Sequence, residues 1–246
     1  MKLRNPQNRF QLSIKKNDRV LEVGGGHNPH PRSNLVVDKY TGNDNQHRVT
    51  DLKVLRHQQF MEADGENLPF KDHEFDYVIC CHVLEHVPNP QKFLAEQFRV
   101  AKRGYIETPS LLGEYLAQKD SHKWILHEHE DVLYLMDKKE LNFFPRYDTG
   151  NLFHDYLPKH SIGYKIIQRT HPNVETIRIE WEHNFNFEVN PQDPEIRKFF
   201  TGPWNYQWND SFFPPRSMGN EFKAAAAAMW DISKSVFKSK VLKKGN

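Results

Sequence analysis

A short apolar run near the N-terminus contains one acidic residue and ends in three glycines, Val20-Leu21-Glu22-Val23-Gly24-Gly25-Gly26. Such a run is typical of a strand that is buried on both faces of a parallel sheet. Glycines at its end allow a sharp backbone turn and let a ligand approach the main chain without meeting a Cβ atom. In open α/β sheets, ligands bind at the carboxyl ends of the strands. The segment therefore predicts an α/β fold with a ligand site at the glycine turn.

Three later segments repeat the arrangement of a polar group at or near the end of a strand. Leu35-Val36-Val37-Asp38 ends in an acid that suits a ribose, and Glu62-Ala63-Asp64-Gly65-Glu66 carries further acids. Phe75-Asp76-Tyr77-Val78-Ile79-Cys80-Cys81-His82 ends in a histidine. Because neighbouring parallel strands end at the same edge of a sheet, we expect one nucleotide-sized pocket.

The residues after the glycines narrow the kind of ligand. A P-loop needs a Lys-Ser/Thr pair there, but His27-Asn28-Pro29 follows instead. A dinucleotide site needs Gly-x-Gly-x-x-Gly at the start of a helix, and its third glycine is replaced by Pro29, which has no N–H group for a pyrophosphate. The pattern therefore indicates a ligand without a phosphate group.

These motifs resemble the class I S-adenosylmethionine-dependent methyltransferases, in the broad group that includes small-molecule methyltransferases of the ubiquinone-biosynthesis type. The resemblance covers residues 20–109 and includes two further segments, Ala63-Asp64-Gly65-Glu66-Asn67-Leu68-Pro69-Phe70 and His82-Val83-Leu84-Glu85-His86-Val87. It implies an α/β, Rossmann-like methyltransferase with a mostly parallel sheet and an antiparallel edge strand. It also implies S-adenosyl-L-methionine as the cofactor.

The same resemblance implies which residues hold the cofactor. Glu22 and the glycine turn, Gly24, Gly25 and Gly26, would face the methionine part. Asp38 would accept hydrogen bonds from the ribose hydroxyls, Asp64 would accept one from the adenine amino group, and the Gly65 N–H would bind a ring nitrogen. Each donor of the cofactor would then meet an acceptor at a strand end.

The segment between Gly26 and Leu35 is shorter than the crossover that parallel strands normally need, and it contains Pro29 and Pro31. We therefore expect a tight loop in place of a helix. Compact turns of this type resemble those of methyltransferases encoded among glycan-building enzymes, which points to a glycan or sugar precursor as the substrate.

Methyl transfer from a sulfonium is an in-line displacement, so positioning can supply most of the acceleration. A hydroxyl acceptor must also lose a proton, which favours a nearby base. His82, which would line the floor beneath the sulfonium, is the first candidate, followed by His86 and Glu85. Because no Asn/Asp-Pro-Pro-Tyr motif is present, transfer to oxygen is favoured over transfer to the nitrogen of a small amine or nucleoside. A cofactor-binding scaffold without activity is the third hypothesis.

The segment 121–137 predicts an inserted hairpin that is rich in histidine. As a substrate lip it would present His122, Trp124 and His127, whereas in a purely structural hairpin Trp124 would pack in the core. A metal site would need His127 and His129 on one strand face and His122 folded back toward them, so we expect no metal.

The remainder of the chain predicts a methyltransferase domain over residues 1–189 and an aromatic-rich extension over 190–246 that wraps or caps it. Strands are expected at 164–167 and 174–187. A helix is expected from Glu221 to Lys240, including the alanine run Ala224–Ala228.

Composition narrows the partners and the compartment. The formal net charge is +2, from 34 basic and 32 acidic residues, which gives no electrostatic footprint for nucleic acid. Cys80 and Cys81 are adjacent on a strand and point to opposite faces, so we expect free thiols in a reducing cytoplasm. No apolar run is long enough for membrane insertion. A small-molecule or glycan substrate is the expected partner, and the oligomeric state stays open.

Overall fold

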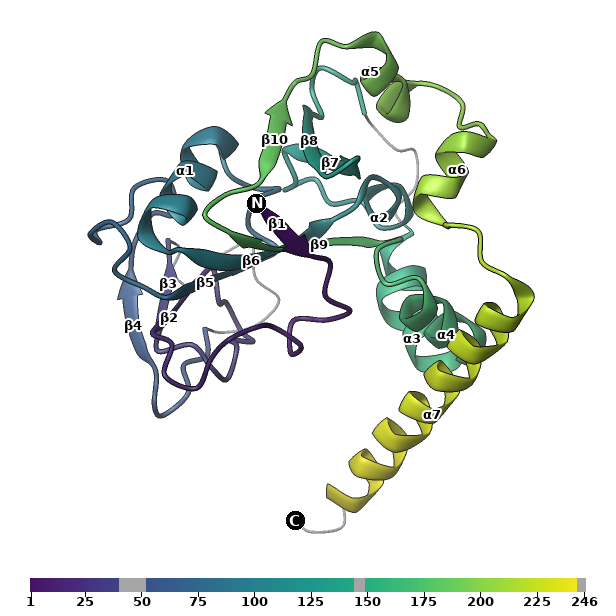
Figure 1. The fold of residues 1–246 in the computed structure, drawn as a ribbon, viewed down its shortest axis with the longest axis horizontal. Helices are drawn as coiled ribbons and strands as arrows, with labels where there is room; N and C mark the ends of the chain where they lie inside the picture. The colour runs from purple at the N-terminus through teal and green to yellow at the C-terminus, as the bar shows by residue number, and fades with distance from the viewer. Residues whose placement is uncertain (40–51, 144–148, 243–246) are drawn as a thin grey trace.

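The computed structural model describes residues 1–39, 52–143 and 149–242 (Figure 1). Its strands are β1 (Lys2–Arg4), β2 (Val20–Val23), β3 (Leu35–Asp38), β4 (Gln59–Glu62), β5 (Tyr77–Cys81), β6 (Arg103–Pro109), β7 (Trp124–His129), β8 (Val132–Asp137), β9 (Thr176–Glu182) and β10 (Asn186–Val189). Its helices are α1 (Pro90–Val100), α2 (Leu111–Leu116), the π-helical turn η1 (Asn151–Tyr156), α3 (Leu157–His160), α4 (Ile162–Thr170), α5 (Pro194–Thr201), α6 (Tyr206–Phe212) and α7 (Met218–Leu242).

Seven strands form the main sheet in the order β1-β9-β6-β5-β2-β3-β4. The five strands from β6 to β4 are parallel, and β9 runs antiparallel to both β6 and β1. The predicted α/β fold, with a mostly parallel sheet and an antiparallel edge, is therefore confirmed. In the register, Glu22 lies between Val36 of β3 and Ile79 of β5, which aligns the ends of these strands.

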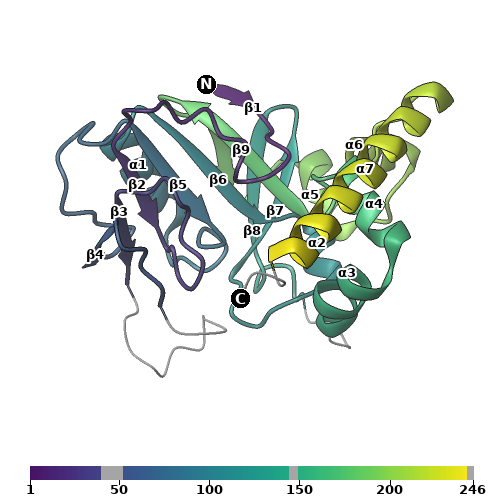
Figure 2. The ribbon, with the colours of Figure 1, turned by 90° about the horizontal axis from the view of Figure 1, so that it is seen from below.

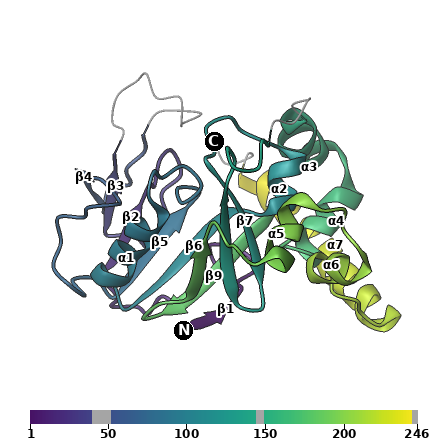
Figure 3. The same cartoon turned by 90° about the horizontal axis from the view of Figure 1, so that it is seen from above.

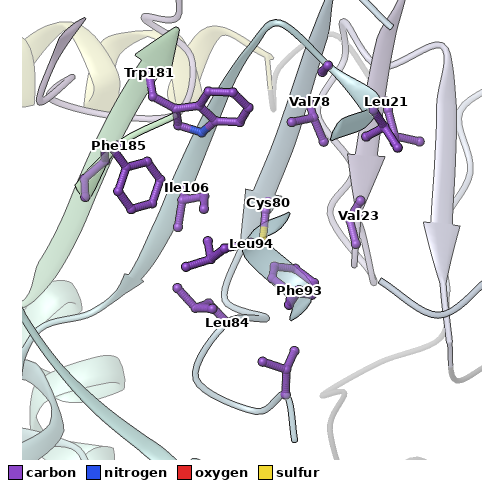
Figure 4. Close-up of a cluster of buried hydrophobic side chains, with 14 of the residues drawn as sticks. Leu21, Val23, Val78, Cys80, Leu84, Phe93, Leu94, Ile106, Trp181 and Phe185 are labelled. Atoms are coloured by element: carbon purple, nitrogen blue, oxygen red, sulfur yellow. The ribbon is translucent and has the colours of Figure 1, made fainter. Parts of the chain in front are cut away.

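The central strands form because their residues are apolar on both faces. All four residues of β2 are buried. On one face, Leu21, Val23, Val78 and Cys80 pack against helix α1, which contributes Phe93 and Leu94 (Figure 4). Helix α1 begins at Pro90, and the side chain of Asn89 caps it by accepting a hydrogen bond from the Lys92 N–H at 2.9 Å.

The opposite face is covered by the N-terminal segment in place of helices. Leu12 and Ile14 pack against a cluster that contains Val20, Tyr77 and Tyr105. The connection between β2 and β3 contains turns and no helix, as the short, proline-containing loop predicts. The N-terminal segment therefore packs directly on this face of the sheet. Its Arg9 side chain reaches Glu22 of β2.

A second, smaller sheet has the order β10-β8-β7 and includes the predicted hairpin, with β7 antiparallel to β8. The side of β7 and β8 away from the first sheet is covered by the chain after residue 190. Phe199 and Phe200 of α5 and Phe212 of α6 pack with Ile125 and Met136. Figures 2 and 3 show the helices α2 to α7 gathered beside this sheet, away from β2, β3 and β4.

The strand expected at residues 164–167 is wrong, because these residues lie in helix α4. The Ser161 hydroxyl caps this helix by accepting from the Tyr164 N–H at 3.1 Å, and α4 packs against α7. Capping and tertiary packing therefore outweigh the strand propensity of Tyr164, Ile166 and Ile167. Helix α7 contains the predicted 221–240 helix, and the last residues of the expected extension, 243–246, lie outside the described residues. No described helix combines the length and the apolar character that a bilayer span requires.

Candidate functional site

The glycine turn lies at the end of β2, where the backbone needs residues without a side chain. Gly24 and Gly26 have φ angles of 73° and 52°, in the left-handed region that favours glycine. A Cβ atom on Gly24 would lie 2.1 Å from Cγ2 of Val83, whereas on Gly26, within the part of the chain that the structure describes, it would meet only the Gly24 carbonyl oxygen, at 3.9 Å. The turn is therefore packed against the loop after β5 on one side and open beside Gly26.

Glu22 is buried beneath this turn and holds the tight loop together. Its carboxylate accepts hydrogen bonds from the His30 N–H and the Ser33 hydroxyl, each at 2.7 Å, and Arg9 Nη2 lies 3.3 Å away. Burial raises the pKa of Glu22 above its usual range, although these hydrogen bonds and the Arg9 charge act in the opposite direction. The structure gives Glu22 a role in loop folding, and its contact with a ligand stays a prediction.

Asp38 and Asp64 lie at the next two strand ends. Asp38 is the last residue of β3, and its carbonyl accepts from the Ala63 N–H at 3.2 Å, one residue before Asp64. Asp64 forms an ion pair with Lys39 at 2.6 Å. Burial alone would raise the pKa of Asp64, but hydrogen bonds from Lys39 and from the Glu66 N–H lower it. The fold thus brings the two predicted acceptor carboxylates to neighbouring positions.

Gly65, the remaining predicted cofactor residue, packs closely under these strand ends. A Cβ atom there would lie 2.5 Å from Cε2 of Phe93 on helix α1. Only glycine therefore fits between this loop and helix α1.

His82 follows β5 and has a strained backbone, with a φ of 56°. Its Nε2 atom lies 3.2 Å from Glu107 Oε1 and its Nδ1 atom lies 3.4 Å from Glu85 Oε1. Burial by itself lowers the pKa of His82, but the two carboxylates outweigh it and raise the pKa to about 9. The side chain is half exposed, and at neutral pH its imidazole is protonated.

Glu107 and Arg178 extend this charged cluster and were not predicted from the sequence. The Glu107 carboxylate accepts hydrogen bonds from the Tyr105 hydroxyl and, at 3.3 Å, from Arg178 Nε. Burial would raise the pKa of Glu107, but His82 and Arg178 lower it to about 2. The signal for Glu107 was its place at the end of β6. Arg178 comes from β9, and nothing local in the sequence links it to His82.

The predicted substrate residues His122 and Trp124 are buried. His122 Nδ1 lies 2.5 Å from Glu114 Oε2, and His86 lies beside it with the two ring centroids 4.7 Å apart. Trp124 donates from its indole N–H to the Val87 carbonyl at 2.8 Å and belongs to the main hydrophobic core. Stacking of Trp124 on a substrate would require it to leave that core, whereas the roles of His122 and His86 stay predictions.

His127, the third predicted substrate residue, lies on β7 among aromatic rings. Its ring centroid is 4.5 Å from that of Phe199 and 5.0 Å from that of Phe212. Burial, with a smaller contribution from His129, lowers the pKa of His127 to about 3. His127 also borders a cavity of about 310 Å³ that is lined by Lys2, Ser110 and Phe212, among others. Its role as a substrate residue stays a prediction.

The described site therefore combines two kinds of chemistry at one edge of the sheet. Carboxylates at successive strand ends can accept hydrogen bonds from ammonium, hydroxyl and amino groups. Beside them, a cationic imidazole between Glu85 and Glu107 can donate hydrogen bonds to an anionic or polar group. The carboxylates and the imidazole all come from the segment between Glu22 and Glu107.

Comparison with known proteins locates the similarity in the same part of the chain. A family model described as a methyltransferase domain matches residues 21–106. The uncharacterized protein MJ1123 of Methanocaldococcus jannaschii is 39% identical over 94 residues, which cover 33% of this chain and 44% of that protein. Sterol 24-C-methyltransferase erg6 of Schizosaccharomyces pombe is 27% identical over 139 residues, or 51% of this chain and 35% of that protein.

A third relative is the ubiquinone/menaquinone biosynthesis C-methyltransferase UbiE of Ectopseudomonas mendocina. It is 31% identical over 103 residues, which cover 37% of this chain and 40% of that protein. The chain thus spans less than half the length of the curated relatives that it matches.

Proposed function

We propose that this chain, whose residues 21–106 match a methyltransferase-domain family model, transfers a methyl group from S-adenosylmethionine to a hydroxyl group of a small molecule or glycan precursor. The observation that carries the proposal is the set of carboxylates at neighbouring strand ends, next to a glycine turn. Glu22, Asp38 and Asp64 follow one another along β2, β3 and the loop after β4. A methionine ammonium, ribose hydroxyls and an adenine amino group are the donors that such a series matches.

Residues of this chain would hold the cofactor as follows. The open side of Gly26 leaves room for the methionine part, and Glu22 lies beneath it. Asp38 would bind the ribose, and Asp64 with the Gly65 N–H would bind the adenine. Lys39 now pairs with Asp64, so adenine binding would displace or share that ion pair. When bound, the cofactor supplies an electrophilic methyl group on a sulfonium.

His82, Glu85 and Glu107 would act on the acceptor. An imidazole that is protonated at neutral pH donates hydrogen bonds, so His82 would orient an acceptor oxygen before it receives any proton. Before it could accept a proton from the acceptor, the protonated His82 would have to release its own proton. That proton would pass to solvent, because the side chain is half exposed. His86 would shape the loop through its hydrogen bond with the Ser121 carbonyl.

The acceptor atom defines the second candidate function. Two of the relatives are named as C-methyltransferases, which favours carbon as the alternative acceptor. Oxygen is preferred here because the groups beside His82 are charged and polar, and they suit a hydroxyl better than an apolar carbon centre. A glycan precursor is proposed from the compact loop after Gly26.

Calorimetric titration with S-adenosylmethionine and S-adenosylhomocysteine is the first test. We expect micromolar binding of both, and a loss of at least about tenfold for Asp64→Asn, because one good hydrogen bond to a charged group contributes about 1.5–3 kcal/mol. Asp72→Asn, in the adjacent loop with a side chain that is 74% exposed, is the matched control and should bind as the wild type does.

The outcomes separate the hypotheses. Binding of both ligands with turnover of a screened hydroxyl acceptor supports the proposal, and methylation only at carbon or nitrogen overturns the choice of oxygen. Binding without turnover of any acceptor favours the scaffold. Failure to bind either ligand would exclude a methyltransferase that uses this site.

A further inference from the structure

Three side chains from two separate segments converge beside His82. Glu85 and His86 lie in the loop after β5, and His122 lies in the connection between α2 and β7. A carboxylate oxygen and one nitrogen from each ring all lie within 4.8 Å of one another. Two imidazoles and one carboxylate, which are far apart in the sequence, thus form one cluster.

Both rings are oriented through their Nδ1 atoms. His86 Nδ1 donates to the Ser121 carbonyl at 3.0 Å, and His122 Nδ1 donates to Glu114 Oε2 at 2.5 Å. A carbonyl and a carboxylate only accept, so they place the proton of each ring on Nδ1. Histidines that bind metals almost always donate their other N–H in this way. The Nε2 atoms are therefore the nitrogens that we assign to a ligand.

Glu114, the acceptor for His122, is itself held in place. Its carboxylate is 1% exposed and forms an ion pair with Lys138 on the segment after β8. A buried, ionised carboxylate behind a histidine increases the basicity of the ring and fixes its orientation.

Glu85 provides the second independent observation. It is 1% exposed, and its Oε2 atom accepts from the Thr108 hydroxyl at 3.1 Å. Among the described residues, its Oε1 atom has no hydrogen bond, and His82 Nδ1 forms an ion pair with it at 3.4 Å. Burial of a carboxylate is strongly unfavourable unless the charge is paired or coordinates a metal. The ion pair with His82 leaves Oε1 without a hydrogen bond, so this oxygen can still accept a metal ion, which would take the place of His82 as the partner of the Glu85 charge.

We propose that Glu85, His86 and His122 bind a divalent transition-metal ion of the zinc type, through a carboxylate oxygen and two Nε2 atoms. Two imidazoles and one carboxylate are a donor set that zinc accepts with a further position left open. Mg²⁺ and Ca²⁺ prefer oxygen donors alone. In a tetrahedral site, metal–ligand bonds of about 2.1 Å place the donors about 3.4 Å apart, so side-chain rotations would have to bring the most distant donors closer by about 1.4 Å.

The sequence led us to expect no metal at a site of His127, His129 and His122; of these three histidines, His127 and His129 lie elsewhere. His127 and His129 stack on each other with centroids 6.2 Å apart and pack against Phe199. Glu85 has a part in both proposals, but binding of Zn²⁺ is measured without cofactor or acceptor, so the two proposals are tested separately.

The test is metal binding by the tag-free, full-length chain after dialysis against a chelator. We expect one equivalent of Zn²⁺ per chain, measured by competition with a chromophoric chelator. Co²⁺ in place of Zn²⁺ should give the visible absorption bands of a site with a low coordination number. The near-ultraviolet band of a cobalt–thiolate bond, which coordination by Cys80 or Cys81 would add, should be absent.

Three variants locate the site. His122→Gln should lower the affinity for Zn²⁺ by more than about 100-fold, and Glu114→Gln, which removes only the partner of His122, by about 10–100-fold. His129→Gln is the matched control and should bind as the wild type does. Circular dichroism establishes that each variant is folded.

Absence of stoichiometric Zn²⁺ binding and of a Co²⁺ spectrum in the wild type would overturn the proposal. Wild-type affinity in folded His122→Gln would overturn it as well. Loss of binding in His129→Gln, with His122→Gln unaffected, would move the site to β7 and contradict the assignment.

Discussion

His82 is the residue at which backbone strain and charge coincide. A non-glycine residue at a φ of 56° costs free energy that the surrounding structure must offset, and such strain is concentrated at functional sites. Here the His82 N–H donates to the Glu107 carbonyl at 2.8 Å, and the imidazole lies between two carboxylates. These contacts hold the side chain at the end of β5, in line with Glu22 and Asp38.

We predict that His82→Gln retains S-adenosylmethionine binding but lowers kcat by about 10²–10⁴-fold, the usual contribution of a positioned acid–base group. The measurement is release of S-adenosylhomocysteine with an accepted substrate, together with calorimetric titration of the cofactor. His73→Gln is the control, because His73 is exposed and has a φ of 53°. Unchanged kcat in His82→Gln would remove His82 from the reaction.

At the scale of elements, the aromatic packing of α5 and α6 on β7 surrounds a single buried imidazole. His127 is 3% exposed, and its Nε2 atom has no hydrogen-bond partner among the described residues. Burial and the neighbouring His129 lower the pKa of His127 to about 3. Protonation of this ring would therefore place a charge among Phe199, Phe200 and Phe212.

The sign of the pH effect follows from the depressed pKa. Because the unfolded chain binds this proton near pH 6.5 and the folded chain near pH 3, the stability from neutral His127 is complete above pH 6.5 and falls as the pH drops toward 3. Between pH 7 and pH 5 we expect a loss of about 2 kcal/mol from this residue. Urea unfolding of wild type and His127→Leu at both pH values measures it. An equal pH dependence in the two proteins would contradict it.

Helix α4 is the element at which local patterns gave the wrong answer. The sequence Tyr164-Lys165-Ile166-Ile167 alternates as a strand does, but a serine cap and contact with α7 select a helix. The α7 partner lies far along the chain, and no window around residue 164 contains it. Strand β9 lies within the predicted strand segment 174–187, and it pairs antiparallel with β6 and β1.

At the scale of the whole molecule, the N-terminal segment stabilises the sheet face opposite helix α1. Glu180 of β9 is fully buried and connects this segment to the sheet. Its carboxylate accepts hydrogen bonds from the Tyr77 hydroxyl, the Ser13 N–H and Arg4 Nε, each at 2.6 Å. One carboxylate therefore joins β1, the segment after it, β5 and β9.

We predict that Glu180→Ala lowers the free energy of unfolding by about 3–5 kcal/mol, because it leaves several donors without their buried partner. Glu188→Ala, at an exposed position of β10, is the control and should change the free energy by less than about 0.5 kcal/mol. Denaturant unfolding measures both. Equal stabilities of the two variants would show that the N-terminal segment does not depend on Glu180.

The sequence by itself determined strands β2, β3, β5 and β6, the tight loop after Gly26 and the carboxylates at the strand ends. These features are local: apolar runs specify buried strands, glycines specify the turn, and the parallel arrangement places the ends together. Asp38 and Asp64 were predicted for this reason, without knowledge of any contact between them.

Only the tertiary structure decided which distant side chains meet. The pairing of His82 with Glu107, of Glu107 with Arg178 and of His122 with Glu114 depends on the packing of β6, β9 and α2 around β5. Tertiary packing also decides that residues before β2 cover the face of the main sheet opposite α1. Contacts of this kind arise from burial over the whole chain, and no local pattern of residue types encodes the partner.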